Sequence, residues 1–297
     1  MKSGKGSGVG AGVVSSCAEP GVTMKLRTVF SPEGARVTLK GFSLADTLDC
    51  GQCFRWEQNP DGSFSGMAEG RALTIRQQGD ELLLCGVGEA DFPFWRRYFD
   101  LDADYGAMIR CFPADETLQR ACGQAGGIRL LRQEPWEALC SFIISQNNNI
   151  PRIKGIIGRL CEQFGQPVPG GFAFPRPEEL ADRTVEELAP LRAGFRAKYI
   201  LDAAEKAASG VLLLARLETA PLEEARQALQ TIRGVGPKVA ECALLYGFHR
   251  LDAFPVDTWI KKVLARYYPG GFPDCGGYEG LAQQFLFHYI RLKDRGL

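Results

Sequence analysis

Between Lys25 and about Leu84, apolar residues come in short runs and alternations, interrupted by turn signals such as Asn59 to Gly62. Alternation of apolar and polar residues is typical of strands with one buried face. The segments with this pattern are RTVF (27–30), ARVTLK (35–40), QCFRWEQ (52–58), SFSGMA (63–68), ALTIRQQ (72–78) and ELLLCG (81–86). They predict an antiparallel sheet connected by hairpins.

Beyond Asp91 apolar residues recur every three to four positions, which is typical of amphipathic helices. The segments with this spacing are 135–146, 153–164, 184–191, 197–209, 222–232, 238–248 and 258–268. Strands followed by helices indicate an α+β fold. We expect a disordered tail rich in Gly and Ser over 1–23, an antiparallel-sheet domain over 24–118 and a helical domain over 119–297, with a hairpin near 222–248.

Length and hydropathy narrow the classes of protein to consider. The 297 residues suffice for one large domain or two moderate ones. No apolar run reaches the roughly eighteen residues that a membrane span needs. Met1 to Gly10 is basic but is not followed by the apolar region of a signal peptide. We therefore expect a cytoplasmic protein, associated with the nucleoid in a bacterium or nuclear in a eukaryote.

The charge distribution allows only a local contact with nucleic acid. The formal net charge is zero, which argues against a protein that coats nucleic acid. Residues 1–115 hold 12 Lys and Arg against 15 Asp and Glu, whereas residues 116–297 hold 23 against 20. A basic patch is therefore expected in the second half of the chain.

The ten cysteines are scattered through apolar segments, as small buried hydrophobic residues are in a reducing compartment. Cys50 and Cys53 form a CxxC, but no second pair accompanies it, and His249 and His288 are the only histidines. A single CxxC is a weak signal for zinc or redox chemistry. We therefore predict no metal and no cofactor.

The stretch QTIRGVGPKVAEC (230–242) contains a glycine pair, Gly234 and Gly236, between two predicted helices. A dinucleotide fingerprint would need a preceding strand and a third glycine, and a P-loop would need Gly-Lys-Ser/Thr. What remains is a helix, a tight turn and a second helix. Glycines permit positive φ and close approach of a ligand, and amides at a helix start suit a phosphate oxygen. Such a hairpin is either an ordinary turn or a sequence-independent grip on DNA.

Lys238 lies in the first turn of the helix that follows this hairpin, and Asp257 precedes the next amphipathic helix. Asp257 suits an N-cap. The short distance along the chain allows both side chains to face one cleft. A helix N-terminus and partial desolvation both favour a neutral amine, which is the form that attacks an electrophilic carbon. A nearby carboxylate can stabilise positive charge that develops on a sugar.

The segment from Ile232 to Asp257 resembles the motif of the helix-hairpin-helix DNA glycosylases. Three further stretches resemble the 8-oxoguanine DNA glycosylases of that superfamily: GQCFRW (51–56), RLLRQEPWEALCSFIISQNNNIPRI (129–153) and GLAQQFLF (280–287). The resemblance runs from about Leu44 to the C-terminus. It implies a TATA-binding-protein-like sheet, then a helical domain, in a protein that excises 8-oxoguanine from duplex DNA during base excision repair.

By this resemblance Lys238 is the Schiff-base nucleophile and Asp257 is the stabilising carboxylate of a bifunctional glycosylase and abasic-site lyase. Two alternative classes of protein carry the same hairpin. A sibling glycosylase acting on adenine or alkylated purines should lack a lysine at this position. A non-catalytic DNA-binding module would not need the pair of residues and usually carries a more basic surface.

The resemblance also assigns residues to the flipped-out base. The Gly51 carbonyl would accept a hydrogen bond, Gln283 would read the base edge, and Cys242 and Phe287 would cover the two faces. Such contacts offset part of the cost of taking a base out of the duplex. Glycine at position 51 would let the backbone approach the base closely.

The remaining assigned residues concern the DNA that stays behind. Asn147, Arg152 and Arg196 would contact the orphaned cytosine, with Asn148 beside them at the loop tip, and Phe195 would fill the gap in the duplex. Amides and planar guanidinium groups are suited to base edges. The resemblance implies double-stranded DNA containing 8-oxoguanine as the partner of a monomer.

The chain departs from the family pattern at several positions. Trp259 stands where many members have a histidine near the phosphate of the flipped nucleotide, which puts that contact in doubt. Phe195 stands where a tyrosine is common in eukaryotic members, which puts the preference for opposite cytosine in doubt. Pro151 stiffens the loop after the asparagines. Only Cys275 follows Cys242, so the four-cysteine iron–sulfur cluster of the endonuclease III branch is not expected.

Overall fold

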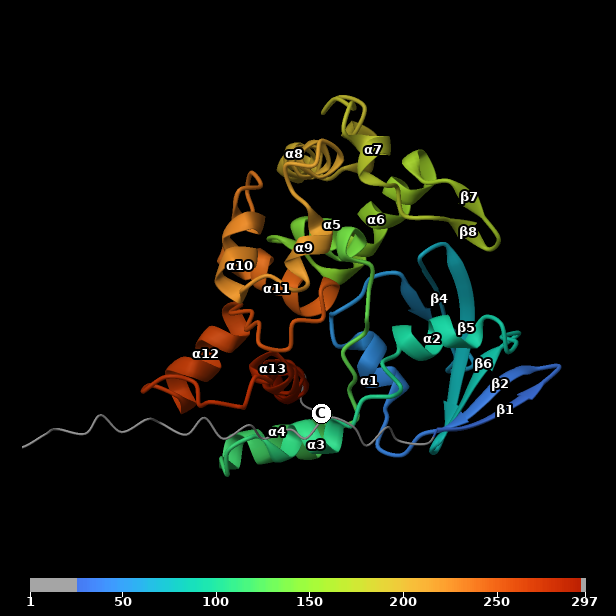
Figure 1. Cartoon of the computed structure of the whole chain (residues 1–297), viewed down its shortest axis with the longest axis vertical. Coiled ribbons are helices and arrows are strands. Elements are labelled where there is room, and N and C mark those ends of the chain that lie inside the picture. The colour runs from blue at the N-terminus through green and yellow to red at the C-terminus, as the bar shows by residue number, and fades with distance from the viewer. Residues whose placement is uncertain (1–25, 295–297) are drawn as a thin grey trace, which may run out of the picture.

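The computed structural model describes residues 26–294 and has an antiparallel sheet next to a larger group of helices (Figure 1). Its strands are β1 (Arg27–Ser31), β2 (Gly34–Thr38), β3 (Trp56–Gln58), β4 (Phe64–Ala68), β5 (Arg71–Gln78) and β6 (Glu81–Cys85). They form one six-stranded sheet in the order β1-β2-β6-β5-β4-β3, and every neighbouring pair is antiparallel. The predicted sheet is confirmed. The tail predicted over 1–23 lies outside the described residues.

The sheet region contains a helix that the pattern of alternation did not predict. Helix α1 (Leu44–Asp49) starts at Ser43, whose side chain accepts a hydrogen bond from the Asp46 amide at 3.3 Å. The strand predicted over 52–58 is wrong in its first half, since only Trp56–Gln58 pairs with β4. Gly51 has a φ of +84°, which no strand accommodates, so the chain turns here before it enters the sheet.

Helices of six or more residues make up most of the chain after the sheet. They are α2 (Phe92–Tyr98), α3 (Tyr105–Arg110), α4 (Glu116–Ala125), α5 (Pro135–Ser145), α6 (Ile150–Phe164), α8 (Ala197–Ala208), α10 (Leu222–Gln230), α11 (Pro237–Gly247), α12 (Thr258–Tyr267) and α13 (Glu279–Asp294). The short elements are β7 (Pro167–Val168), β8 (Gly171–Phe172), α7 (Pro177–Leu180), η1 (Ala189–Leu191), η2 (Gly194–Arg196) and α9 (Leu214–Leu217). The α+β prediction is therefore confirmed.

The helix predicted over 184–191 is wrong. Thr184 and Glu187 cap one another, as at a helix start, through bonds of 2.7 and 3.2 Å between side chain and backbone. Only the 3-10 turn η1 forms, however, because Pro190 has no amide hydrogen to donate to a preceding carbonyl. Arg192 then adopts a left-handed backbone with φ +56°, which ends the turn.

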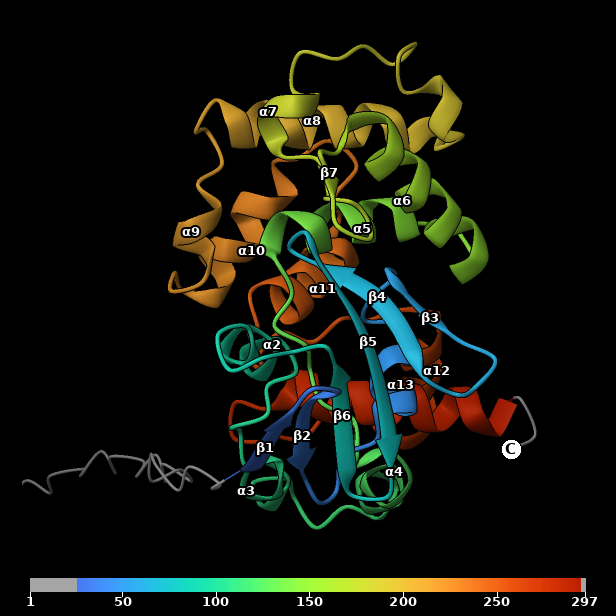
Figure 2. The same cartoon turned by 90° about the vertical axis from the view of Figure 1, so that its right-hand side faces the viewer.

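Two hydrophobic cores lie side by side. Helices α1 and α2 pack their apolar residues on the sheet, and this core runs from Ala35 to Leu101 with the addition of Leu131. The second core joins α3 and α4 to the later helices, where α11 packs on α5 and α10, and α13 packs on α4 and α12. Figures 1 and 2 show α13 between the sheet side and α12. No helix among residues 26–294 is long and apolar enough to span a bilayer.

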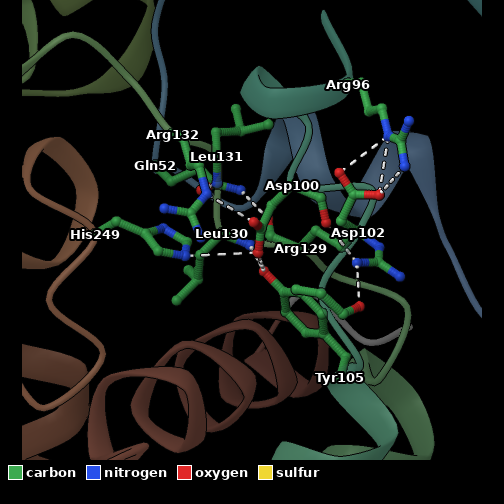
Figure 3. Close-up of polar contacts among 11 residues, drawn as sticks. Gln52, Arg96, Asp100, Asp102, Tyr105, Arg129, Leu130, Leu131, Arg132 and His249 are labelled. Carbon is green, nitrogen blue, oxygen red and sulfur yellow. Dashed lines mark hydrogen bonds and ion pairs between the residues drawn. The ribbon is translucent and has the colours of Figure 1, made fainter. Parts of the chain in front are cut away.

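A buried polar cluster around Asp100 links the two cores (Figure 3). The Asp100 carboxylate accepts hydrogen bonds from Arg132 Nε at 2.7 Å and from the Tyr105 hydroxyl at 3.1 Å. His249 Nε2 lies 3.5 Å from the same carboxylate, and Arg129 Nη1 donates to the Asp100 carbonyl at 2.7 Å. Because His249 follows the end of α11, the cluster anchors that helix to the segment after α2.

Candidate active site

The predicted hairpin is present between α10 and α11 and packs against α8. Gly234 has a φ of +76°, and a Cβ at this position would lie 2.3 Å from Tyr199 Cε2. Both the backbone conformation and the packing therefore require glycine there. Gly236 is the N-cap of α11, and no atom lies within 4 Å of the place of its Cβ. The hairpin thus presents an open backbone surface at Gly236 and a packed one at Gly234.

Lys238 and Asp257 border the same cavity, which has a volume of about 50 Å³. Lys238 lies in the first turn of α11 and is half-buried. Asp257 is the N-cap of α12, and its Oδ1 accepts a hydrogen bond from the Ile260 amide at 2.8 Å. The carboxylate is held in place by the helix that it caps, so its position is fixed without a contact from Lys238.

Five segments far apart in the sequence meet at this cavity. Gly51 comes from the loop between α1 and β3, Lys238 and Cys242 from α11, and Gln283 and Phe287 from α13. The complete lining is Gly51, Phe142, Lys238, Cys242, Tyr246, Pro255, Asp257, Gln283 and Phe287. Both residues predicted to be catalytic and all four predicted to hold the base thus lie around one cavity, while their individual roles stay predictions.

The cavity combines an apolar wall with a few polar groups. The Lys238 ammonium position lies 5.6 Å from the ring centroid of Phe142, which forms part of the wall. Burial raises the pKa of the Cys242 thiol, although the charge of Lys238 and its hydrogen bond act in the opposite direction, so Cys242 presents a neutral thiol. Gln283 is 3 % exposed, and its Oε1 has no hydrogen-bond partner among the described residues. A buried acceptor without a partner indicates a ligand group that donates to it.

Gly51 is required for its backbone conformation rather than for lack of space. A Cβ at Gly51 would lie 3.6 Å from Arg291 Nη1 and 3.7 Å from Phe287 Cε1, which are ordinary contacts. Its φ of +84°, however, is unfavourable for any residue with a side chain. From the sequence alone, glycine at position 51 is explained by close approach of the backbone to the base. In the structure, the positive φ of the turn is the stronger requirement for glycine at position 51.

The residues predicted to contact the DNA that stays behind lie in the turn between α5 and α6, in the first turn of α6 and in η2, and part of their polar capacity is already used. Asn148 Nδ2 donates to the Ile144 carbonyl at 3.1 Å and so caps the end of α5. Arg196 is 2 % exposed and donates to the carbonyls of Gln146, Asn147 and Ala193. Both residues shape the loops in this structure, and any base contact from them would be additional.

The other members of this group face solvent. Asn147 is exposed and has a left-handed backbone with φ +46°. Arg152 is exposed, and its Nη2 donates to the Arg192 carbonyl at 3.3 Å. Phe195 is 44 % exposed, with the Arg196 guanidinium 4.4 Å from its ring centroid. An exposed aromatic side chain beside exposed polar groups is suited to enter a duplex.

Sequence reasoning missed three residues that line the cavity: Phe142, Tyr246 and Pro255. Phe142 and Tyr246 lie in apolar helical segments and are indistinguishable there from core residues. Their rings stack with centroids 5.1 Å apart and an angle of 20° between planes. Only the packing of α5 against α11 shows that this pair forms a wall of the cavity.

The CxxC pair is structural. The Cys50 thiol donates to the Thr47 carbonyl and the Cys53 thiol to the Leu48 carbonyl. Burial raises the pKa of Cys50 to about 12 and that of Cys53 well above its ordinary value, so neither forms a thiolate at neutral pH. Within residues 26–294, no group of three or more His, Cys, Asp or Glu is placed to hold a metal ion.

A larger groove of about 730 Å³ lies between β4, β5 and α6, away from Lys238 and Asp257. Its two central cations already have partners. Arg55 donates to the Phe172 carbonyl and lies 3.4 Å from Glu137, and Lys154 lies 3.0 Å from Glu57. Both cations of the groove are therefore already paired, and the two residues predicted to be catalytic lie at the smaller cavity instead.

Comparison with known proteins agrees with this geometry. Residues 35–139 match the family described as 8-oxoguanine DNA glycosylase, N-terminal domain, and residues 140–271 match the HhH-GPD superfamily of base excision DNA repair proteins. An N-glycosylase/DNA lyase from Saccharomyces cerevisiae is 34% identical over 257 residues, which cover 76% of this chain and 68% of the relative.

Solved structures resemble the whole fold. The structure of MBOgg1 in complex with a low affinity DNA ligand has a TM-score of 0.85 and 40% identity, covering 92% of this chain and 100% of the other. The Clostridium acetobutylicum 8-oxoguanine glycosylase/lyase, in complex with dsDNA containing cytosine opposite to 8-oxoG, has a TM-score of 0.83 and 33% identity, covering 93% and 99%. With its sheet, hairpin and cavity, this chain belongs to the 8-oxoguanine DNA glycosylase family of the HhH-GPD superfamily of base excision DNA repair proteins.

Proposed function

We propose that this protein flips 8-oxoguanine out of duplex DNA, excises it with Lys238 and Asp257, and then cleaves the strand at the abasic site. The observation that supports this most is the meeting of a lysine, a carboxylate and all four residues predicted to hold the base at one cavity. Family membership supports the same enzyme class, DNA N-glycosylase and DNA lyase.

The proposed reaction uses the neutral amine of Lys238 as nucleophile. Its lone pair forms a bond to C1′ of the deoxyribose while the N-glycosidic bond breaks, and the base leaves with that electron pair and takes up a proton. Positive charge develops on the sugar during this step, and the carboxylate of Asp257 stabilises it. The nitrogen bound to C1′ then loses a proton, and its lone pair breaks the C1′–O4′ bond as O4′ takes up a proton. The ring-opened iminium formed in this way makes the proton at C2′ acidic. Its removal expels the 3′ phosphate, which cuts the strand.

Base discrimination in this proposal depends on two groups in the cavity. 8-Oxoguanine carries a hydrogen on N7, where guanine has a lone pair, and the Gly51 carbonyl can accept only from the former. Gln283, with its buried Oε1 lacking a partner, reads the other edge. An unpaired buried acceptor costs about 1–3 kcal/mol, so one such contact can give a tenfold to hundredfold preference.

Lys238 as nucleophile distinguishes this activity from that of a related glycosylase in which water is the nucleophile. Incubating the protein with a duplex that carries one 8-oxoguanine, in the presence of borohydride, should trap a protein–DNA adduct. Lys238→Gln should lose the adduct and still bind lesion DNA. A trapped band of normal intensity from that variant would show that another residue is the nucleophile.

Sedimentation of the same complex should give one protein per duplex, as expected for a monomer.

A further inference from the structure

The loop that carries Gly51 is held from the sheet side by Gln52, which is completely buried. Gln52 Nε2 donates to the carbonyls of Thr47 and Arg129, both at 2.8 Å, and its Oε1 accepts from the Leu131 amide at 2.9 Å. These bonds fix the residue after Gly51. They do not reach the peptide bond that joins Cys50 to Gly51.

That peptide bond is held from the helical side. Gln284 in α13 is completely buried, and its Nε2 donates to the Cys50 carbonyl at 3.4 Å. The Oε1 of the same side chain accepts from the Tyr246 hydroxyl at 2.6 Å. A tyrosine hydroxyl donates only one hydrogen, and here it is directed at the amide oxygen. The amide nitrogen of Gln284 is thereby left facing Cys50.

Tyr246 is connected to the nucleophile as well. Its ring stacks on Phe142, with centroids 5.1 Å apart, and Phe142 lies 5.6 Å from Lys238 Nζ. Tyr246 also borders the cavity, although it is only 5 % exposed. Tyr246 therefore stacks on the ring that lies beside Lys238, and its hydroxyl reaches the loop of Gly51 through Gln284.

We propose that Tyr246 and Gln284 are positioning residues that set the preference for 8-oxoguanine over guanine. They hold the peptide bond before Gly51 and Gln52 anchors the residue after it, so that the Gly51 carbonyl between these two anchors keeps one orientation. The inference rests on the proposed function, in which the Gly51 carbonyl reads the hydrogen on N7. The bond from Gln284 to Cys50 is long, and its geometry depends on the short bond that anchors the other end of the amide. Without the hydroxyl, the Gln284 amide is free to rotate. Its oxygen would then face the Cys50 carbonyl, and repulsion between these two acceptors would displace the peptide.

Tyr246→Phe tests this directly, because it keeps the ring that stacks on Phe142 and removes only the hydroxyl. Single-turnover excision of 8-oxoguanine opposite cytosine should fall about fivefold or more, as expected for loss of a buried hydrogen bond. Strand cleavage at a preformed abasic site, which does not involve base reading, should stay within about twofold of wild type. In the Lys238→Gln background, the ratio of Kd for guanine and lesion duplexes should shrink by a factor similar to that of the excision rate.

Tyr98→Phe is the matched control. Tyr98 is also buried, at 4 % exposure, and its hydroxyl accepts from Trp56 Nε1 at 2.9 Å within the sheet core. This variant should lose a comparable amount of stability while both rates stay unchanged. Gln284→Met is the second variant and should reproduce the selective loss. Adding Tyr246→Phe to it should cause no further loss, because both changes remove one relay.

Four results separate the possibilities. An unchanged Kd ratio in Tyr246→Phe, or equal losses of excision and abasic-site cleavage, would overturn the positioning role and leave the pair as ordinary core packing. Additive effects of Tyr246→Phe and Gln284→Met would also overturn it. If wild-type protein fails to excise 8-oxoguanine at all, it is the proposed function that fails, and that outcome is recognised before any variant is made.

Discussion

Asp257→Asn separates the two roles that the structure gives to one carboxylate. Asp257 caps α12 through a 2.8 Å bond from the Ile260 amide and also borders the cavity with Lys238. Asparagine caps a helix about as well as aspartate, because its side-chain oxygen accepts the same bond. The substitution therefore removes the negative charge and keeps the cap.

The two effects differ enough in size to be told apart. Removing a preorganised group that stabilises charge in the transition state costs on the order of 3 kcal/mol, which corresponds to about a hundredfold in rate. The interaction of the charge with the helix dipole contributes only about 0.3–1 kcal/mol to folding. We expect excision to fall about a hundredfold while the free energy of unfolding falls by less than about 1 kcal/mol.

The assay is single-turnover excision of 8-oxoguanine, alongside chemical denaturation and lesion binding for each variant. Asp104→Asn is the matched control, since Asp104 caps α3 through a 2.8 Å bond from the Ala107 amide and is not part of the cavity. Asp257→Ala should add about 1 kcal/mol of destabilisation from the lost cap. An excision rate less than tenfold below wild type in Asp257→Asn would refute the catalytic role and leave Asp257 as a cap.

Three further changes have defined outcomes. Gly51→Ala should reduce excision of 8-oxoguanine at least tenfold, because φ +84° strains an alanine by about 1 kcal/mol or more and displaces the carbonyl. Cleavage at a preformed abasic site should keep the wild-type rate, and an equal loss of that rate would contradict the prediction. Arg152→Ala should bring the excision rate of 8-oxoguanine opposite cytosine closer to the rate opposite adenine, since a bidentate base contact is worth about 1–3 kcal/mol. Equally weaker binding to both duplexes, with an unchanged ratio of rates, would make Arg152 a phosphate contact instead. Burial raises the pKa of Asp100, but His249 and Arg132 outweigh it and lower the pKa to about 2. Because the folded pKa lies below that of the unfolded chain, this stabilisation is complete above about pH 4 and is lost as the pH falls toward 2. When the free energy of unfolding is measured between about pH 4 and 2, it should fall less steeply for Asp100→Asn than for wild type. Parallel curves for the two proteins would exclude Asp100 as the source of this pH dependence.

Much of the fold could be predicted because its signals are local. Strand β5 follows an alternation of apolar residues and β6 a short apolar run, and α11 and α12 begin where Pro237 and Asp257 indicate a helix start. The glycine turn before α11 also carries its own signal, since Gly234 has the positive φ that glycine favours. Each of these features depends on residues within a few positions along the chain, so the sequence alone was enough.

The candidate site was predicted in part by motif and could not be predicted by pattern alone. Nothing within ten residues of Gln283 shows that it is buried with an unpartnered oxygen, because its surroundings come from other elements. The same holds for Arg196, which appears in the sequence as a surface charge but holds the carbonyls of Gln146 and Asn147. The surroundings of both side chains are determined by the packing of segments that are distant in the sequence.

Helix α1 and the relay from Tyr246 through Gln284 to Cys50 show what only the tertiary structure decided. The residues of the relay are 38 and 234 positions apart along the chain, and each looks like an ordinary core or polar helical residue by itself. A buried amide must find a donor and an acceptor wherever packing places it. Only the joint packing of α11, α13 and the Gly51 loop determines which groups of these segments meet.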